Sequence, residues 1–111
     1  MATNKKQVRK NFRDSVFKRD GYKCVECGAI YSKETAEKFL DAHHITDRTL
    51  MPSGGYVKEN GISLCKDDCH VNAEVYHGSC GQEWFPGMHP DDLYKLIGSS
   101  LELAMRESNK L

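Results

Sequence analysis

Four cysteines in two closely spaced pairs are the residues of this 111-residue chain whose chemistry is most clearly indicated. Two residues separate Cys24 from Cys27, and three residues separate Cys65 from Cys69. Pairs at such spacing are typical of a closed tetrahedral site in which four thiolates bind one structural zinc ion. We therefore predict that these four side chains hold a structural Zn²⁺.

A second group of polar residues, His43, His44, Asn60 and His70, lies within and just beyond this frame of cysteines. A neutral imidazole can bind a metal or accept a proton, because its reference pKa is about 6.5. An amide has no basicity to offer and acts through hydrogen bonds. The ordered set predicts an active site that is separate from the scaffold zinc.

Two assignments stay open at this point. Four residues separate Cys65 from His70, which is also an acceptable ligand spacing, so zinc could take His70 in place of Cys69. The second site would then lose a ligand. Glu74 and His77 would share the face of His70 if this segment is helical, and either could complete a metal shell. An exposed helix face is the alternative for both.

The cysteine count and the N-terminus argue against a disulfide framework. The chain has five cysteines, an odd number, and it has no apolar N-terminal signal segment. We therefore expect a reducing compartment, with Cys80 as a free thiol. No run approaches the roughly 18 apolar residues that span a bilayer, so we expect a soluble protein without a membrane partner.

The formal net charge of zero conceals a basic N-terminal segment. Residues 1–23 carry eight basic and two acidic side chains, a net charge of +6, and the rest of the chain carries −6. Such a segment favours a polyanionic partner, because phosphate contacts supply most non-specific nucleic-acid affinity. A merely solvated helix face is the alternative. The candidate phosphate-binding residues are Lys5, Lys6, Arg9, Arg13 and Arg48, the last with an ordinary surface arginine as its alternative.

The elements that must position these residues follow from periodicity and turn signals. Val8, Phe12 and Val16 recur every four residues, which predicts an amphipathic helix that Asp20-Gly21 ends. Alternation over 39–45 predicts a strand on which His43 and His44 face opposite sides. Trp84 and Phe85 are expected to be packing anchors. The remaining expected elements are a cysteine knuckle at 24–28, a short helix at 33–38 capped by Ser32, a loop at 46–59, a strand at 62–65, a helix at 69–77, and one last helix that Pro90 opens and that carries an apolar stripe of Leu93, Leu96, Ile97, Leu101 and Ala104.

With these residues in view, the chain resembles the HNH endonucleases, the ββα-metal or His-Me finger class, in their zinc-knuckle form. The resemblance rests on Arg19–Gly28, Asp41–Ile45, Glu59–Cys65 and Cys69-His70, taken in this order, and it spans about residues 13–77. The tail looks like that of small stand-alone phage or bacterial members. The three-residue spacing between Cys65 and Cys69 departs from the common two.

The resemblance implies an α+β fold and a role for each polar residue. His44 would be the general base, His43 and His70 would bind one catalytic divalent metal (Mg²⁺, Mn²⁺, Ni²⁺ or Zn²⁺), and Asn60 would hold the loop that orients His44. Asp41 is a candidate acceptor that orients His43. The expected single domain, 1–111, consists of a basic N-terminal helix (1–22), a zinc-knuckle and ββα-metal core (23–77), and a loop with a C-terminal helix (78–111).

The implied activity is metal-dependent hydrolysis of DNA phosphodiester bonds, by nicking or double-strand cleavage, with weak sequence preference. The expected partner is DNA, a specificity or packaging protein is a further candidate, and the expected location is the cytoplasm of a bacterial host or phage-infected cell. Two alternatives stay open: a non-catalytic zinc-binding module that grips nucleic acid, and an RNA nuclease with the same site. The oligomeric state also stays open.

Overall fold

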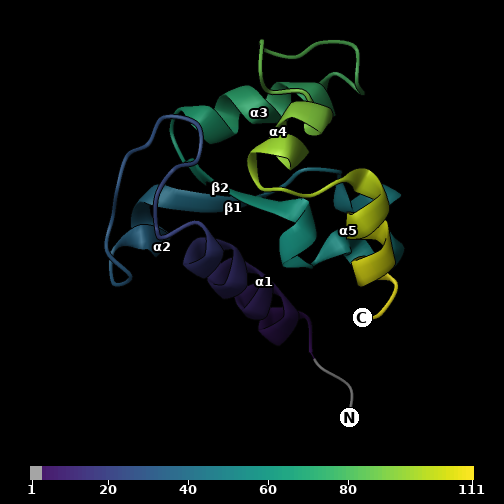
Figure 1. The fold of residues 1–111 in the computed structure, drawn as a ribbon, viewed down its shortest axis with the longest axis horizontal. Helices are drawn as coiled ribbons and strands as arrows, with labels where there is room; N and C mark the ends of the chain where they lie inside the picture. Colours follow the sequence, from purple (N-terminus) through teal and green to yellow (C-terminus); the bar gives the residue numbers. More distant parts are fainter. Residues whose placement is uncertain (1–3) are drawn as a thin grey trace.

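Two short strands form the only sheet within residues 4–111, the part of the chain that the computed structural model describes. β1 (Leu40–His44) pairs antiparallel with β2 (Gly61–Cys65), and His44 lies opposite Gly61. Five α-helices surround this sheet in the described range, so the domain is a small α+β structure, as predicted (Figure 1). Both predicted strands are thus confirmed, with ends shifted by one residue.

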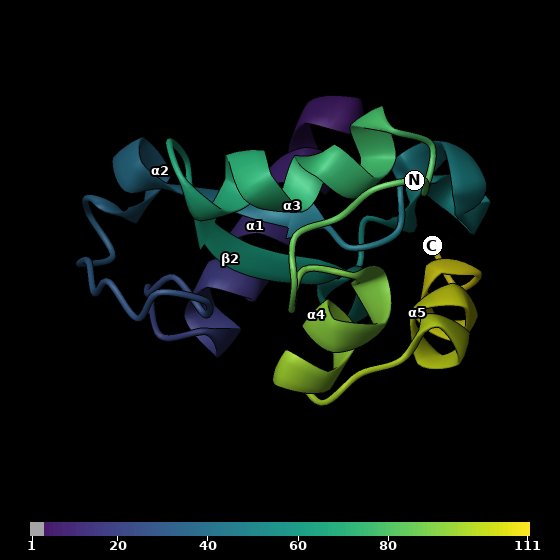
Figure 2. The ribbon, with the colours of Figure 1, turned by 90° about the horizontal axis from the view of Figure 1, so that it is seen from above.

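The first helix, α1 (Lys5–Arg19), ends just before Asp20-Gly21, as predicted, and packs on the sheet. It is shorter than the predicted 1–22, of which residues 1–3 lie outside the described part of the chain. Phe12 and Val16 are buried on its inner face. A Cβ atom on Gly61 would lie 2.5 Å from Val16 Cγ2 and 2.7 Å from the Phe12 ring, so only glycine lets helix and strand approach this closely. The sheet lies between α1 and α3 (Cys69–Gly78), as the two views of the ribbon agree (Figures 1 and 2).

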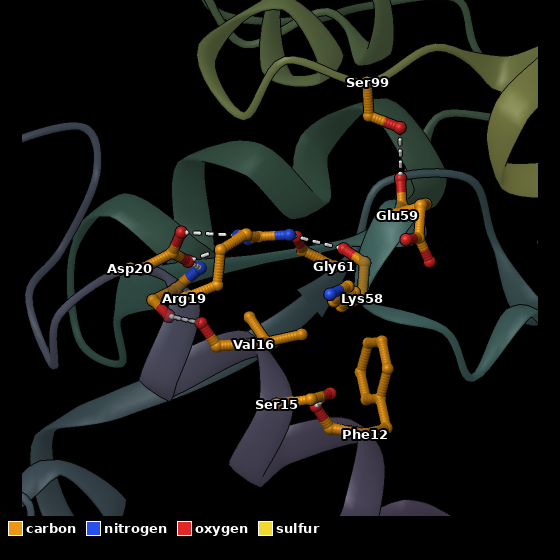
Figure 3. Close-up of polar contacts among 10 residues, drawn as sticks. Phe12, Ser15, Val16, Arg19, Asp20, Lys58, Glu59, Gly61 and Ser99 are labelled. Atoms are coloured by element: carbon orange, nitrogen blue, oxygen red, sulfur yellow. Dashed lines mark hydrogen bonds and ion pairs between the residues drawn. The ribbon is translucent and has the colours of Figure 1, made fainter.

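Polar contacts attach the C-terminal end of α1 to β2 (Figure 3). The Arg19 guanidinium donates to the carbonyl oxygens of Gly61, at 2.7 Å, and of Lys58. The buried Asp20 carboxylate accepts from Arg19 Nε at 2.8 Å and from Ser63 N–H at 2.9 Å. Because hydrogen bonds to charged groups contribute about 1.5–3 kcal/mol each, this network fixes the helix against the strand.

The C-terminal region corrects one prediction. The expected single last helix is two helices, α4 (Pro90–Leu96) and α5 (Leu101–Ser108). Gly98 interrupts the helix with a φ of 69°, and the Ser100 hydroxyl then caps α5 by accepting from Leu103 N–H at 3.1 Å. The apolar spacing continues across this break, which is why periodicity alone predicted one element.

Three further predictions differ in detail. Trp84 and Phe85 are each 47% exposed and are not packing anchors. The predicted helix at 33–38 is reduced to α2 (Ala36–Phe39), whose N-cap is Thr35 and not the predicted Ser32. The Ser32 hydroxyl instead accepts from Thr35 N–H in the preceding turn. The loop at 46–59 contains three short 3-10 turns, η1 (Arg48–Leu50), η2 (Pro52–Gly55) and η3 (Lys58–Asn60). None of the helices in the described range is long and apolar enough to cross a membrane.

Candidate functional site

The four predicted zinc ligands form one cluster. The sulfur atoms of Cys24, Cys27, Cys65 and Cys69 all lie within 4.8 Å of one another, and those of Cys27 and Cys65 are 3.4 Å apart. A tetrahedral zinc ion with Zn–S bonds of about 2.3 Å requires sulfur separations of roughly 3.8 Å. The cluster is therefore close enough to bind a metal ion such as zinc.

Local turns bring the two pairs together. Cys24 and Cys27 lie in a knuckle closed by a hydrogen bond of 2.9 Å from Gly28 N–H to the Cys24 carbonyl, and Gly28 takes a φ of 79° that favours glycine. Cys65 ends β2 and Cys69 begins α3. The structure places Cys69 with the other thiols, and not His70, which was the alternative ligand.

The electrostatics of the cluster differ from one thiol to the next. Burial raises the pKa of Cys65 to about 12 and also raises the pKa of Cys69. Burial acts in the same sense on Cys24, but hydrogen bonds from the Cys27 and Cys65 backbones outweigh it and lower the pKa of the Cys24 thiol. Without a cation, burial thus disfavours the thiolate form of Cys65 and of Cys69. A divalent ion would stabilise their thiolates, because the thiolate is the metal-binding form.

A second cluster lies between β1 and the next turns of α3. Metal-binding atoms of His43, Glu74 and His77 lie within 4.8 Å of one another. Glu74 Oε1 accepts hydrogen bonds from His43 Nδ1 and from His70 Nε2, each at 3.1 Å. His77 Nε2 donates to the His44 carbonyl at 2.9 Å, which leaves the lone pair of a neutral His77 on Nδ1. The structure therefore brings Glu74 and His77 beside His43.

His70 lies at the edge of this second cluster. Its Nδ1 is 2.7 Å from Asp41 Oδ2, so Asp41 orients His70 and not His43, the residue that it was expected to orient. Burial opposes protonation, but the hydrogen bond to Glu74 and the charge of Asp41 raise the pKa of His70. Hydrogen bonds from His43 and His70 hold the pKa of the Glu74 carboxyl well below its usual range.

The donor set of this cluster fits one divalent cation. Octahedral ligands at about 2.1 Å from an ion lie roughly 3 Å apart, close to the 3.1 Å that separates Glu74 Oε1 from each imidazole nitrogen. Imidazole and carboxylate together suit Zn²⁺, Ni²⁺ or Mn²⁺, and the carboxylate also suits Mg²⁺. His43 and Glu74 would serve in any arrangement, with His77, His70 or both beside them.

His44 faces the opposite side of β1, as predicted. Its ring stacks on Phe12 at a centroid distance of 4.5 Å and meets the Tyr56 ring edge-on at 4.7 Å. Its Nε2 is buried and has no hydrogen-bond partner within residues 4–111. Burial, reinforced by the charges of His43 and Arg48, lowers the pKa of His44 to about 4. The imidazole is therefore neutral near pH 7, and it is a weaker base than a free imidazole.

Asn60 is fully buried and binds the loop that follows His44. Its Oδ1 accepts from Thr46 N–H at 3.0 Å, and its Nδ2 donates to the carbonyls of Thr46 and Gly55 at 3.0 and 3.3 Å. A Cβ atom on Gly55, whose φ is 68°, would lie 2.6 Å from Asn60 Nδ2. The Asn60 side chain thus holds the loop between β1 and β2 at two points, through the backbone of Thr46 and of Gly55.

His44 lines one cleft of about 500 Å³ together with Glu74 and His77 of the second cluster. A neighbouring groove of about 410 Å³ shares two of its lining residues, Arg48 and Tyr56, and adds Lys5 and Arg9 from α1. Of the five candidate phosphate-binding residues, Lys5, Arg9 and Arg48 are brought together here. Lys6 lines neither hollow, and Arg13 pairs with Glu37 at 3.1 Å. The cleft lining consists of Ala42, His44, Asp47, Arg48, Tyr56, His70, Glu74, His77 and Gly78.

Sequence reasoning missed two tyrosines at this site. Tyr56 lines both hollows. Tyr94 is buried, its hydroxyl donates to Asn60 Oδ1 at 2.7 Å, and the same hydroxyl lies 2.7 Å from Thr46 Oγ1. Tyr94 reaches the site from α4, far along the chain, and nothing in its local sequence signals this contact. For Tyr56, the two glycines that precede it were a local signal of close packing.

Comparison of the chain with protein-family models, with curated proteins and with solved structures gave no match. What the chain can do therefore follows from its own side chains. Its side chains form a thiol cluster suited to one ion and a histidine and carboxylate cluster suited to another. The neutral His44 lies at a cleft that Arg48 also lines.

Proposed function

We propose that this chain is a metal-dependent endonuclease of the HNH type, which hydrolyses DNA phosphodiester bonds on a ββα-metal core formed by β1, β2 and α3. One observation carries the proposal. His44, Glu74 and His77 line the same cleft of about 500 Å³, and Arg48 lies on its rim. A proton acceptor, a candidate metal cluster and a phosphate-binding cation are the three components that the reaction requires.

His44 would act as the general base. A water molecule attacks the phosphorus, His44 accepts the proton that the water loses, and the bond from phosphorus to the 3′ oxygen breaks. The products carry a 5′-phosphate and a 3′-hydroxyl, the latter after protonation by solvent water. The pKa of His44, about 4, keeps the imidazole neutral at pH 7, which is the protonation state of a base, but it also makes the ring a weaker base than a free imidazole.

His43 and Glu74 would hold the catalytic divalent metal together with His77, and His70 would join them or orient Glu74. When bound, the ion supplies Lewis-acid stabilisation of the charge on the phosphate and the leaving oxygen. His43 and His44 are adjacent on β1 and face opposite sides, so one strand presents a ligand and a base without competition between them.

The remaining residues would orient the base and the substrate. Asn60 fixes the backbone at Thr46, two residues after His44, through a pair of hydrogen bonds of 3.0 Å. Arg48 is exposed at the rim, where a guanidinium can bind a phosphate through two donors. Lys5 and Arg9 continue this positive surface along the groove. Contacts to phosphate position a duplex without reading its sequence, which supports weak sequence preference.

The test is conversion of supercoiled plasmid to nicked and linear DNA with Mg²⁺, Mn²⁺ or Ni²⁺. We expect cleavage by the wild type and its loss in zinc-loaded His44→Ala. The matched control is His89→Asn, because His89 lies outside the cleft and caps α4 by accepting from Asp91 N–H, a role that asparagine can keep. Cleavage of RNA but not DNA would support the RNA nuclease. DNA binding without cleavage by any metal would support the non-catalytic module.

A further inference from the structure

Tyr56 lies where the cleft and the basic groove meet. Its ring contacts the His44 ring edge-on, at a centroid distance of 4.7 Å and an angle of 89°. It also meets the Phe12 ring edge-on at 5.7 Å. Its hydroxyl accepts from Arg48 Nη1 at 3.5 Å, the outer limit of a hydrogen bond. One side chain therefore contacts both the candidate base and the candidate phosphate-binding cation.

The loop before Tyr56 is built to hold the ring in this place. Gly54 has a φ of 81°, and a Cβ atom there would lie 2.7 Å from Tyr56 Cε2. The Tyr56 ring thus packs directly on the backbone of Gly54. The next residue, Gly55, is fixed by the Asn60 amide, which donates to its carbonyl at 3.3 Å. The position of Tyr56 is consequently tied to the same asparagine that holds the loop after His44.

The geometry restricts how the His44 ring can turn. Phe12 covers one side of the imidazole by stacking at 4.5 Å, and the Tyr56 ring, perpendicular to the imidazole, closes another. Aromatic pairs of this kind contribute about 0.5–1.5 kcal/mol beyond the area that they bury. The Arg48 hydrogen bond, with a contribution from the nearby Arg9, lowers the pKa of Tyr56 against the opposing effect of burial. The hydroxyl thus lies in the field of the cations that would bind a phosphate.

We propose that Tyr56 is a positioning residue that aligns the ring of His44 with the phosphate bound by Arg48. Its ring supports the base, and its hydroxyl orients the guanidinium. This inference rests on the proposed endonuclease function, since it assigns Tyr56 a part in that reaction. The two functional groups of the side chain should therefore affect different kinetic constants.

The experiment compares Tyr56→Phe with Tyr56→Leu, using a fluorescent DNA duplex as substrate at saturating metal. Tyr56→Phe keeps the ring and loses the hydroxyl, so we expect KM to rise roughly 3- to 10-fold with kcat unchanged. Tyr56→Leu also loses the ring, so we expect kcat to fall by about 10- to 100-fold, because small misplacements of a reacting group have effects of this size. Tyr22→Phe is the matched control, since Tyr22 lies in a different hollow, also among basic residues.

The outcomes separate this inference from the function on which it rests. A wild type that cuts no DNA overturns the proposed function itself. An active wild type, with both Tyr56 variants matching it in kcat and KM, overturns only the role of Tyr56. A loss of activity in proportion to the fraction of unfolded protein, measured by thermal unfolding of each variant, also overturns it. A low kcat in Tyr56→Leu together with a kcat near that of the wild type in Tyr56→Phe supports the positioning role.

Discussion

The four-cysteine cluster and the cluster of His43, Glu74 and His77 differ in what surrounds them. Cys24 is fully buried, Cys69 is 6% exposed and Cys27 is exposed, and the four sulfur donors alone would complete a tetrahedral shell. In the second cluster Glu74 is 49% exposed at its side chain and faces the cleft. A closed shell can only stabilise, whereas an open one can admit substrate or water. The contrast indicates which cluster supports the fold and which could support chemistry.

The two clusters also share one helix. Cys69 is the first residue of α3, and His70, Glu74 and His77 follow within its remaining turns. Whatever fixes the start of α3 therefore also fixes the second cluster. The second cluster should therefore depend on the thiol cluster but not the reverse, because no side chain that lines the cleft belongs to the thiol cluster.

The largest expected effect follows from loss of the ion that we expect in the four-cysteine cluster. Cys69→Ser should abolish zinc binding and unfold the domain, because the binding free energy of structural zinc, about 10–16 kcal/mol in small peptides, is spent largely on folding. Zinc content by mass spectrometry and helicity by circular dichroism would measure this. Cys80→Ser is the control, since Cys80 is an exposed free thiol. A Cys69→Ser protein that stays folded without zinc would contradict the scaffold role.

A smaller effect is expected at the open cluster. Glu74→Gln keeps the shape of the side chain but loses its charge, so affinity for a second ion should fall by at least the roughly 10- to 100-fold that loss of an outer-shell partner costs, while the thiol cluster keeps its own ion. Titration calorimetry with Mn²⁺ on zinc-loaded protein would measure it. Glu83→Gln, at an exposed carboxylate outside the cleft, is the control. Equal affinity in both variants would rule out Glu74 as a ligand.

The depressed pKa of His44 predicts a dependence of stability on pH. In the unfolded chain His44 titrates near 6.5, and in the folded chain near 4, so the unfolded state binds more protons between these values. The stabilisation is present above pH 6.5 and is lost as the pH falls toward 4, by roughly 1–3 kcal/mol.

Urea unfolding of zinc-loaded protein at pH 7 and pH 5 would measure this dependence. His44→Phe should show a smaller difference between the two pH values than the wild type does. An identical difference in both proteins would assign the dependence to other groups.

The smallest effect is expected at the contact between α4 and the loop. Tyr94→Phe removes the hydroxyl that donates to Asn60 Oδ1 and contacts Thr46. Loss of one such hydrogen bond should lower the free energy of unfolding by about 1 kcal/mol. Thermal unfolding would measure it, with Tyr76→Phe as the control because the Tyr76 ring is outside the Asn60 network. A shift above about 3 kcal/mol would mean that the loop itself rearranges.

The sequence predicted those elements whose signals are local. The helical type of α1 followed from residues spaced by four and its end from Asp20-Gly21, and the opposite orientation of His43 and His44 followed from strand alternation. The thiol cluster followed from its spacing. The break at Gly98 was missed, because a continuous apolar pattern hid a glycine with positive φ.

Other contacts had no local signal. Tyr94 reaches Asn60 from 34 residues away, and Asp41 reaches His70 across the sheet and helix interface. Such contacts depend on how elements pack, which periodicity along the chain does not encode. The roles of His44, Asn60 and His70 stay predictions, as do those of the basic residues on the groove.

Because Cys69 lies in the first turn of α3, the thiol cluster fixes how this helix is rotated about its own axis. Each residue advances an α-helix by about 100°, so the direction of Glu74 is fixed by its count from Cys69. A residue inserted between the two would turn the carboxylate away from His43 and leave the thiols as they are. The number of residues between Cys69 and Glu74 therefore sets the direction in which the carboxylate points, relative to the thiol cluster.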